Sequence, residues 1–165
     1  MRKTILAALL VFIGGLTNIA AAQTAPLLPN NVYAQKLADE FTAKYVRLIS
    51  MGIHAKPPNA SDYQIIAHTL RKKVGDKSTP EDMEVMRSGK PDGPNSVEGG
   101  IYDVAIQLFD SSRKTIGVIA LHIKPGPGDP KAEALKMAYQ VRDEIAKQIP
   151  SDAKLFEKTE LAATH

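Results

Sequence analysis

The chain has 165 residues, a formal net charge of +3 and no cysteine. Without cysteine it can form no disulfide, thiolate metal site, Cys-attached haem, lipid-modified N-terminal Cys or thiol nucleophile. The near balance of 21 basic and 18 acidic residues provides no strong field for polyanions, so no nucleic-acid partner is expected. The length suits one domain with its own hydrophobic core.

The first 22 residues have the features of a secretory signal peptide. Met1–Lys3 is a short basic start, and Ile5–Ala22 is a mostly apolar run that ends in three alanines, a small-residue cleavage pattern. Cleavage before Gln23 leaves 143 residues with a formal charge of +1. We therefore expect a periplasmic or secreted protein with no membrane span after cleavage; a retained membrane anchor is the alternative.

The first part of the mature chain predicts a loose lead-in, a long helix and a strand. Residues 23–31 are Pro-rich, whereas Val32–Met51 places apolar side chains at helical spacing and Gly52 follows as a stop signal. Gly52–Asp62 contains consecutive prolines and is expected to be a loop or turn. Tyr63–Leu70 is short and apolar, which predicts a strand.

A second, shorter helix is predicted from the segment Thr-Pro-Glu-Asp that begins at Thr79. Thr79 can cap the helix, the proline suits its first turn, and the two acids complement the positive end of the helix dipole. Asp82, three residues after Thr79, can complete a capping box. We expect Met83 and Met86 to supply the buried side and Gly89 to end the helix.

Two β-rich runs, Ile101–Phe109 and Thr115–Lys124, predict an antiparallel hairpin around the polar turn Asp110–Lys114. The second run is apolar on both faces, which indicates a central strand covered on both sides. With this turn, Phe109 lies opposite Thr115.

The same register places Tyr102 across from His122, with Asp103 and Gln107 together on the opposite face. A shift of one residue would change this pairing.

The C-terminal part predicts one more helix, Lys131–Ile149, followed by a loosely packed tail from Ser151 to His165. Further strands could lie within Gly52–Pro58 and Ser96–Gly100. The order of elements favours an α+β domain over residues 32–150, with an antiparallel sheet and helices packed beside it rather than alternating parallel βαβ units.

No motif in the sequence defines a reaction, and we expect no enzymatic activity and no cofactor. Gly126–Gly128 stands where a dinucleotide-binding turn would lie, but the third glycine is absent and the neighbouring prolines lack N–H groups. Gly75–Ser78 resembles the end of a phosphate-binding loop, but Asp76 separates the glycine from the lysine.

Three histidines precede the tail, at His54, His68 and His122. No two of them have metal-ligand spacing, so no metal site is expected, although three separated histidines could meet in space and bind zinc or haem iron. The simpler interpretation is that each forms hydrogen bonds at a sheet face or loop.

Polar residues within the otherwise apolar hairpin are the best candidates for a binding site, because a buried polar group must find a partner. A small ligand pocket and a half-exposed sheet face both explain them. Asp103 could pair with an amine, and His122 and Tyr102 could donate to a carboxylate. The candidate ligand-binding residues are Tyr102, Asp103, Gln107 and His122, with Tyr63 and His54 as outer candidates.

The hairpin Ile101–Lys124 resembles the closing hairpin of extracytoplasmic PAS-like (Cache-type) sensor domains, which often carry D-x-x-G-x-x-I-G at this turn. Asp110, Ile116 and Gly117 match that pattern, and Arg113 stands where glycine is usual. The helix before the sheet and the segment Val-Gly-Asp-Lys-Ser before the short helix are also similar, so the resemblance spans residues 32–124.

The resemblance implies a PAS- or profilin-like antiparallel sheet flanked by a long N-terminal and a long C-terminal helix. It also implies binding of an organic acid, amino acid or amine without catalysis. Cache sensors normally lie between two membrane spans and feed a signalling module; this chain carries neither, so a stand-alone domain is expected. An alternative is a helix-mediated interaction module that forms a homodimer or binds a membrane-bound sensor, and a less favoured one is a His-ligated haem or metal protein.

Overall fold

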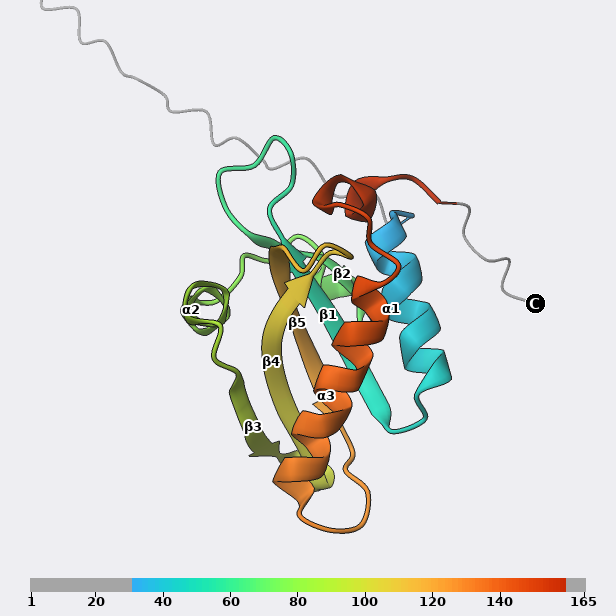
Figure 1. Cartoon of the computed structure of the whole chain (residues 1–165), viewed down its shortest axis with the longest axis vertical. Helices are drawn as coiled ribbons and strands as arrows, with labels where there is room; N and C mark the ends of the chain where they lie inside the picture. Colours follow the sequence, from blue (N-terminus) through green and yellow to red (C-terminus); the bar gives the residue numbers. More distant parts are fainter. Residues whose placement is uncertain (1–30, 160–165) are drawn as a thin grey trace, which may run out of the picture.

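The computed structural model describes residues 31–159 (Figure 1). The predicted signal peptide, residues 23–30 of the lead-in and the last six residues lie outside this range. The α-helices are α1 (Tyr33–Lys44), α2 (Pro80–Ser88) and α3 (Pro130–Ala146). The strands are β1 (Leu48–Ala55), β2 (Gln64–His68), β3 (Asp92–Val97), β4 (Ile101–Phe109) and β5 (Thr115–Ile123). Short 3₁₀ turns are η1 (Arg71–Lys73), η2 (Glu98–Gly100) and η3 (Asp152–Phe156).

The strands form one five-stranded sheet in the order β2-β1-β5-β4-β3, and each neighbouring pair is antiparallel. The predicted α+β class with an antiparallel sheet is therefore confirmed. The hairpin strands are confirmed as β4 and β5, and β5 is the central strand of the sheet, as its two apolar faces predicted. Among the described residues, no helix is both long and apolar enough to cross a membrane.

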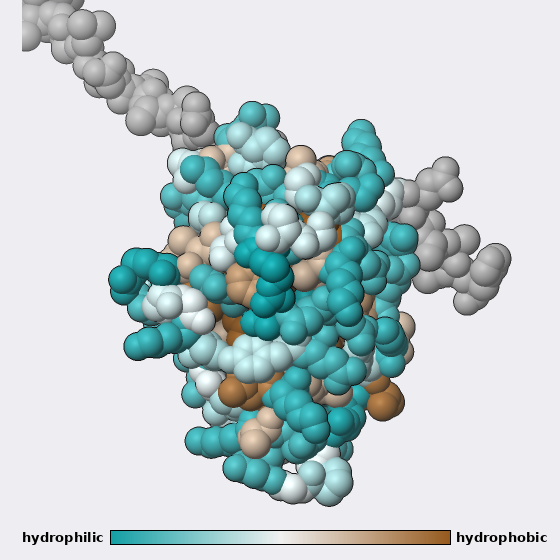
Figure 2. All heavy atoms as spheres, in the orientation of Figure 1, coloured by the Kyte–Doolittle hydropathy of each residue, from teal (hydrophilic) through white to brown (hydrophobic). Residues whose placement is uncertain are grey.

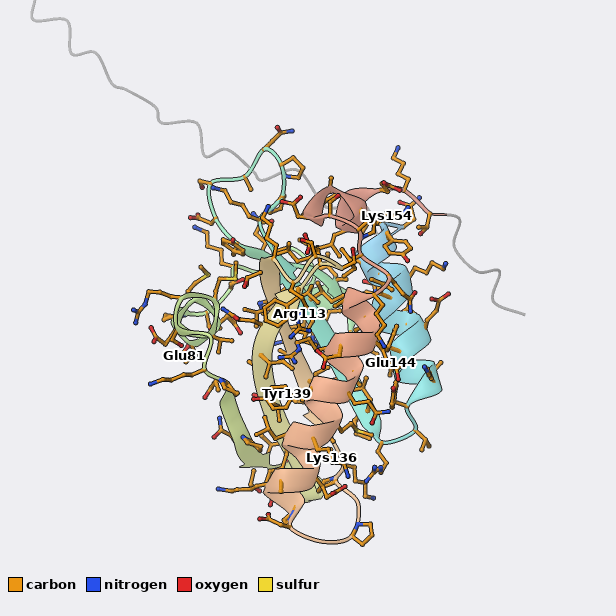
Figure 3. The ribbon with its side chains drawn as sticks, viewed as in Figure 1. Glu81, Arg113, Lys136, Tyr139, Glu144 and Lys154 are labelled. Carbon is orange, nitrogen blue, oxygen red and sulfur yellow. The ribbon has the colours of Figure 1, made fainter. Side chains whose placement is uncertain are left out.

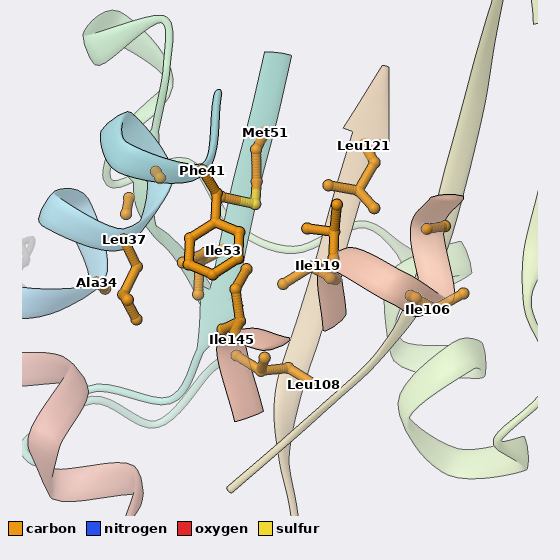
Figure 4. Packing of buried hydrophobic residues seen from close by; sticks show 14 of the residues in the cluster. Ala34, Leu37, Phe41, Met51, Ile53, Ile106, Leu108, Ile119, Leu121 and Ile145 are labelled. Atoms are coloured by element: carbon orange, nitrogen blue, oxygen red, sulfur yellow. The ribbon is translucent and has the colours of Figure 1, made fainter. Parts of the chain in front are cut away.

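The main core lies between one face of the sheet and the pair α1 and α3, which run side by side in Figure 1. We call this the inner face. Buried strand residues alternate along it, and each large side chain buried there contributes about 1.5–3 kcal/mol. Figure 4 labels part of this cluster: Ala34, Leu37, Phe41, Met51, Ile53, Ile106, Leu108, Ile119, Leu121 and Ile145.

The predicted N-terminal helix is too long, because α1 ends at Lys44 and Leu48–Ala55 forms β1. Tertiary pairing overrides the local helical pattern here: Leu48 pairs with Ile123 and Met51 with Leu121 of β5. Gly52 is therefore not a helix stop but lies inside β1, within the range where a further strand was considered.

The start and end of α2 agree with the prediction. Thr79 Oγ1 accepts from the Asp82 N–H at 3.2 Å, and Asp82 Oδ2 accepts from the Thr79 N–H at 2.8 Å, which completes the capping box. Gly89 ends the helix with a φ of 74°. The predicted buried side is wrong for Met83, which is 37% exposed, because Val85 occupies that position against the sheet. Met86 is partly buried beside Val85.

The hairpin has the predicted turn, with Phe109 opposite Thr115, but the register beyond it is shifted. Leu108 pairs with Gly117, so Ile116 is an extra residue in β5, and this β-bulge changes every pairing that follows. Tyr102 consequently lies opposite Ile123, and the predicted pairing of Tyr102 with His122 is wrong. The bulge places Ile116 in the inner core, where its side chain is buried.

The end of the chain is packed more closely than predicted. The helix predicted over residues 131–149 is confirmed as α3, capped by Asp129, but it ends at Ala146. In η3, Leu155 is fully buried in the main core, and Lys158 forms a β-bridge with Val32. The prediction of a loosely packed tail is therefore wrong for residues 152–158, because an apolar side chain anchors them.

Candidate functional site

The face of the sheet opposite α1 and α3, here called the outer face, collects most of the predicted polar residues. Helix α2 covers part of it through Val85, which packs on Ala105 and Val118. Next to this contact, the register places His68, Gly52, Ala120 and Ala105 in one row across four strands. Apart from His68, the residues of this row are small. The row separates the part of the outer face under α2 from the next row, which carries His122 and Asp103.

His54 is held by a polar network beneath α2. Its side chain is only 7% exposed, and Nδ1 lies 3.2 Å from Ser78 Oγ and 3.2 Å from Asp82 Oδ2. Burial raises the pKa of Asp82, but the hydrogen bond and charge of His54, together with Thr79, outweigh burial and keep that pKa below its ordinary value. The ionised Asp82 accepts a hydrogen bond from Nδ1–H of His54, so Nε2 is an acceptor whenever the ring is neutral.

At Nε2, where His54 offers an acceptor, His68 offers a hydrogen-bond donor. Its Nδ1 accepts the Leu70 N–H at 2.8 Å, so the neutral ring carries its proton on Nε2. Burial lowers the pKa of His68, and the nearby charges of Lys73, His54 and His122 lower it further. The ring is therefore neutral near pH 7 and acts as a hydrogen-bond donor.

The two rings converge above Gly52. A Cβ on this residue would lie 3.4 Å from His54 Nε2, 3.5 Å from His68 Nε2 and only 2.9 Å from His68 Cδ2. Any side chain at this position would therefore collide with the His68 ring. His54 Nε2 has no hydrogen-bond partner among residues 31–159. A hydrogen-bond acceptor, His54 Nε2, and a donor, His68 Nε2, therefore both lie close to the position of a Gly52 Cβ, and no group of the described residues bridges them. We call Gly52, His54, His68, Asp103 and His122 the histidine face.

Asp103 and His122 form the second polar pair of this face. They lie opposite each other in β4 and β5, and Asp103 Oδ1 is 3.6 Å from His122 Nε2. Their side chains are 40% and 48% exposed, so the pair contributes little to stability and remains open to a ligand. Burial raises the pKa of Asp103, an effect that His122 partly offsets and that Asp92 and Asp82 reinforce.

The other predicted residues lie elsewhere. Gln107 is on the outer face, but its Nε2 donates to the Met86 carbonyl at 2.9 Å. Tyr102 packs at the margin of the inner core, so it cannot join Asp103. Tyr63 lines a cleft of about 290 Å³ near the β1–β2 loop and the hairpin turn. The structure thus brings together His54, His122 and Asp103 on one face, and separates them from Tyr102 and Tyr63.

Sequence reasoning did not select Gly52 or His68 of the histidine face as binding residues, nor Asp82, which contacts His54. Asp82 was assigned to capping alone, and Gly52 was interpreted as a helix stop. A glycine inside a strand can signal that another group approaches closely, and this signal would have identified Gly52 once β1 was recognised.

The arrangement does not form a metal site in the described part of the chain. No group of three or more His, Cys, Asp or Glu residues between residues 31 and 159 is placed to hold a metal ion. In addition, the hydrogen bond from Leu70 places the His68 proton on Nε2, the atom that would have to coordinate.

Comparisons with known proteins leave the family open. No family model matches the sequence, and no curated protein matches it. Among solved structures, the chain is similar to the inducer-binding domain of the transcription factor PobR from Acinetobacter, a double mutant in complex with 3-hydroxybenzoic acid. The identity is 10%, the match covers 70% of this chain and 97% of that one, and the TM-score is 0.40. A similarity of this size does not establish a shared fold or ligand.

Proposed function

We propose that residues 32–150 form a PAS-like domain that lies outside the cytoplasm and binds a small molecule on its histidine face. One observation carries the proposal: the buried ring of His54 directs an unpartnered Nε2 toward His68 above a glycine. No buried side-chain nitrogen or oxygen of residues 31–159 lacks a hydrogen-bond partner, so this Nε2 is reachable by solvent, and water or a ligand can bind it. The antiparallel sheet flanked by helices agrees with the sensor-domain resemblance.

The chemistry of the two rings favours a ligand with a hydroxyl or carboxyl group. With neutral rings, His54 Nε2 accepts and His68 Nε2 donates, which suits a hydroxyl or a protonated carboxyl. When His54 is protonated, both rings donate, which suits a carboxylate. Asp103 and His122 lie in the next row of the sheet and provide a carboxylate for a ligand amine. Organic acids, amino acids and amines are therefore the classes to test.

The polar network gives no support to hydrolysis. In a catalytic Ser-His-Asp triad the serine and the carboxylate bind opposite nitrogens of the histidine. Here Ser78 Oγ and Asp82 Oδ2 both lie at Nδ1 of His54, so His54 cannot pass the serine proton to a leaving group while Asp82 orients it. We accordingly propose binding without catalysis.

Export of the protein is supported by the basic start, apolar run and alanine cleavage pattern of the first 22 residues. N-terminal sequencing of the protein recovered from a periplasmic extract or culture medium tests it. A mature N-terminus at Gln23 is expected. Recovery of the intact chain in the membrane fraction would favour the retained anchor instead.

A helix-mediated interaction is the second candidate, but the surface gives it less support. Figure 2 shows that the face over α3 is mostly hydrophilic, with only small separated apolar areas. Large apolar patches are typical of lasting interfaces. Light scattering after size exclusion distinguishes the two functions, since a monomer is expected for the ligand-binding domain and a dimer for the interaction module.

The binding proposal is tested by a thermal-shift screen of organic acids, amino acids and amines, followed by calorimetry with any compound that raises the melting temperature. His68→Ala removes the donor above Gly52 and should weaken binding at least about tenfold, which corresponds to about 1.4 kcal/mol. Leu70→Ala, which alters an exposed side chain in the same segment, is the control. Unchanged affinity of His68→Ala, or no stabilising compound at all, would contradict the proposal.

A further inference from the structure

A separate cleft of about 310 Å³ opens along the free edge of β4. Strand β3 pairs with β4 only as far as Ala105, so Ile106–Phe109 has no strand on that side. The walls come from the segment after α2, from β4 and from α3. Its lining residues are Gly89, Pro91, Ile106, Gln107, Phe109, Tyr139, Arg142 and Asp143. None of the residues of the histidine face lines this cleft, so it is a distinct site.

Arg142 is the less exposed of the two charged residues that line the cleft. Its side chain is 14% exposed, and its guanidinium carbon lies 4.7 Å from the ring centre of Tyr139 and 5.0 Å from that of Phe109. Two of its nitrogens, Nε and Nη2, each lie 2.8 Å from Asp143 Oδ1. The third nitrogen, Nη1, has no partner among residues 31–159. The aromatic rings and Asp143 thus fix the guanidinium and leave one donor open.

The charge of this cluster is positive. Arg113 also donates to Asp143 Oδ1, at 3.1 Å, and its guanidinium lies 4.7 Å from the Phe109 ring centre (Figure 3). Burial raises the pKa of Asp143, but the two arginines outweigh burial and hold that pKa below its ordinary value, so the group remains ionised. The cluster of Arg113, Arg142 and Asp143 therefore has a net positive charge, although Arg113 does not line the cleft and Asp143 does. Within the cleft, Arg142 Nη1 is the group available to an anion.

Gln107 adds a fixed acceptor. Its Nε2 donates to the Met86 carbonyl, which determines the orientation of the amide. Its Oε1 then faces the position of Gly89, 3.5 Å from where a Cβ would stand, and has no donor among the described residues. Gly89 keeps the space in front of this oxygen open.

We propose that this cleft binds a small hydroxy-carboxylate with an apolar or aromatic body. The carboxylate pairs with Arg142 Nη1, and the hydroxyl donates to Gln107 Oε1. The body of the ligand packs against Phe109 and Tyr139, because aromatic walls favour ring stacking and apolar contact. The volume is at the lower end of the range for ligand sites, which limits the ligand to a small molecule.

Calorimetry with 3-phenyllactate tests the proposal on the full mature chain. Two matched compounds separate the contacts: phenyllactamide lacks the charge, and 3-phenylpropionate lacks the hydroxyl. Phenyllactate should bind saturably at millimolar or lower concentration, and phenyllactamide at least about tenfold more weakly. 3-Phenylpropionate should bind between the two. Equal binding of the acid and the amide, or no saturable binding of phenyllactate, would overturn the proposal.

Arg142→Gln and Arg113→Gln form the matched pair of variants, since both arginines contact Phe109 and Asp143 but only Arg142 lines the cleft. Arg142→Gln should weaken phenyllactate binding at least about tenfold, and Arg113→Gln less than about threefold. If Arg142→Gln does not fold, Arg142→Lys keeps the charge and should give an intermediate loss. Equal effects of the two Gln variants would contradict the assignment to Arg142.

A further variant separates this site from the histidine face. His68→Ala should leave phenyllactate binding unchanged, whereas it weakens any ligand of the histidine face. Loss of phenyllactate binding in His68→Ala would show that the compound binds elsewhere and would overturn the assignment to the cleft.

Discussion

Replacing Gly52 with alanine tests the geometry of the histidine face through a single methyl group. The new Cβ would lie 2.9 Å from His68 Cδ2, closer than carbon atoms can approach without movement. Movement of the His68 ring away from this Cβ would strain the hydrogen bond that its Nδ1 accepts from the Leu70 N–H. Gly52 does not have a positive φ, so backbone strain does not contribute.

The expected magnitude follows from two opposing terms. Where space allows, a glycine-to-alanine change in a strand stabilises by about 0.5–1 kcal/mol. Overpacking costs about 1–3 kcal/mol, and the lost hydrogen bond belongs to this cost. We expect Gly52→Ala to lower the free energy of unfolding by about 1 kcal/mol, which corresponds to a melting temperature lower by about 2–6 °C.

Urea unfolding of four proteins provides the assay: wild type, Gly52→Ala, His68→Ala and the double variant. In the His68→Ala background the collision is absent, so the alanine at position 52 should become neutral or stabilising. The coupling free energy should therefore be about 1–2 kcal/mol, as expected for side chains in contact. A Gly52→Ala protein as stable as wild type, or effects that simply add, would refute the close approach of His68 to Gly52.

Four further predictions concern other parts of the structure. Asp82→Asn removes the capping carboxylate and should lower stability at pH 7 by about 0.5–2 kcal/mol by urea unfolding. Since the pKa of Asp82 is lowered by folding, its stabilising effect should decrease as the pH falls from about 4 through the folded pKa, and an effect that does not decrease with falling pH would count against this. Val85→Ala should cost about 1–3 kcal/mol and Met83→Ala less than about 0.5, and the reverse order would mean that α2 packs on its other side. The NMR titration midpoint of His68 should lie below about 6.5, and a raised midpoint would contradict the burial of its ring. Because the unfolded chain then binds more protons than the folded chain, the contribution of His68 to stability should decrease as the pH falls from about 6.5 through the folded pKa. Leu155→Ala should cost about 2–5 kcal/mol by urea unfolding, whereas a loosely packed tail would show almost no change.

The elements that the sequence predicted well are those with strong local signals. The capping box at Thr79 and the left-handed Gly89 define both ends of α2 within a few residues. The hairpin turn is likewise local: Asp110 Oδ1 accepts from the Ser112 and Lys114 N–H groups, and Arg113 adopts a φ of 69° where the sensor-domain pattern has glycine. Such signals need no information from distant parts of the chain.

The errors arose where distant segments decide the structure. The helical pattern before Gly52 continues past Lys44, and only pairing with β5 converts Leu48–Met51 to a strand. The bulge at Ile116 depends on its packing in the inner core, so the exact cross-strand pairs were not predictable from the turn alone.

In the candidate site, too, local sequence signals identified single residues, whereas the contacts between them depend on the pairing of distant segments. Polar residues in apolar strands indicated Asp103 and His122 as candidates, but the predicted register placed them on opposite faces of the hairpin. The bulge at Ile116 instead places them opposite each other on the outer face. The meeting of His54 with His68 depends on the register between β1 and β2, which has its own irregularity between Ile53 and His54. No sequence pattern specified that irregularity.

The central claim is that His54 and His68 present an acceptor and a donor above Gly52 for a small ligand. Long-range ¹H–¹⁵N NMR spectra of the histidine side chains test it most directly. At neutral pH, the account predicts a proton on Nδ1 of His54 and on Nε2 of His68, and a stabilising compound from the screen should shift both Nε2 signals. The opposite tautomer at His68, or a bound compound that leaves both signals unchanged, would contradict it.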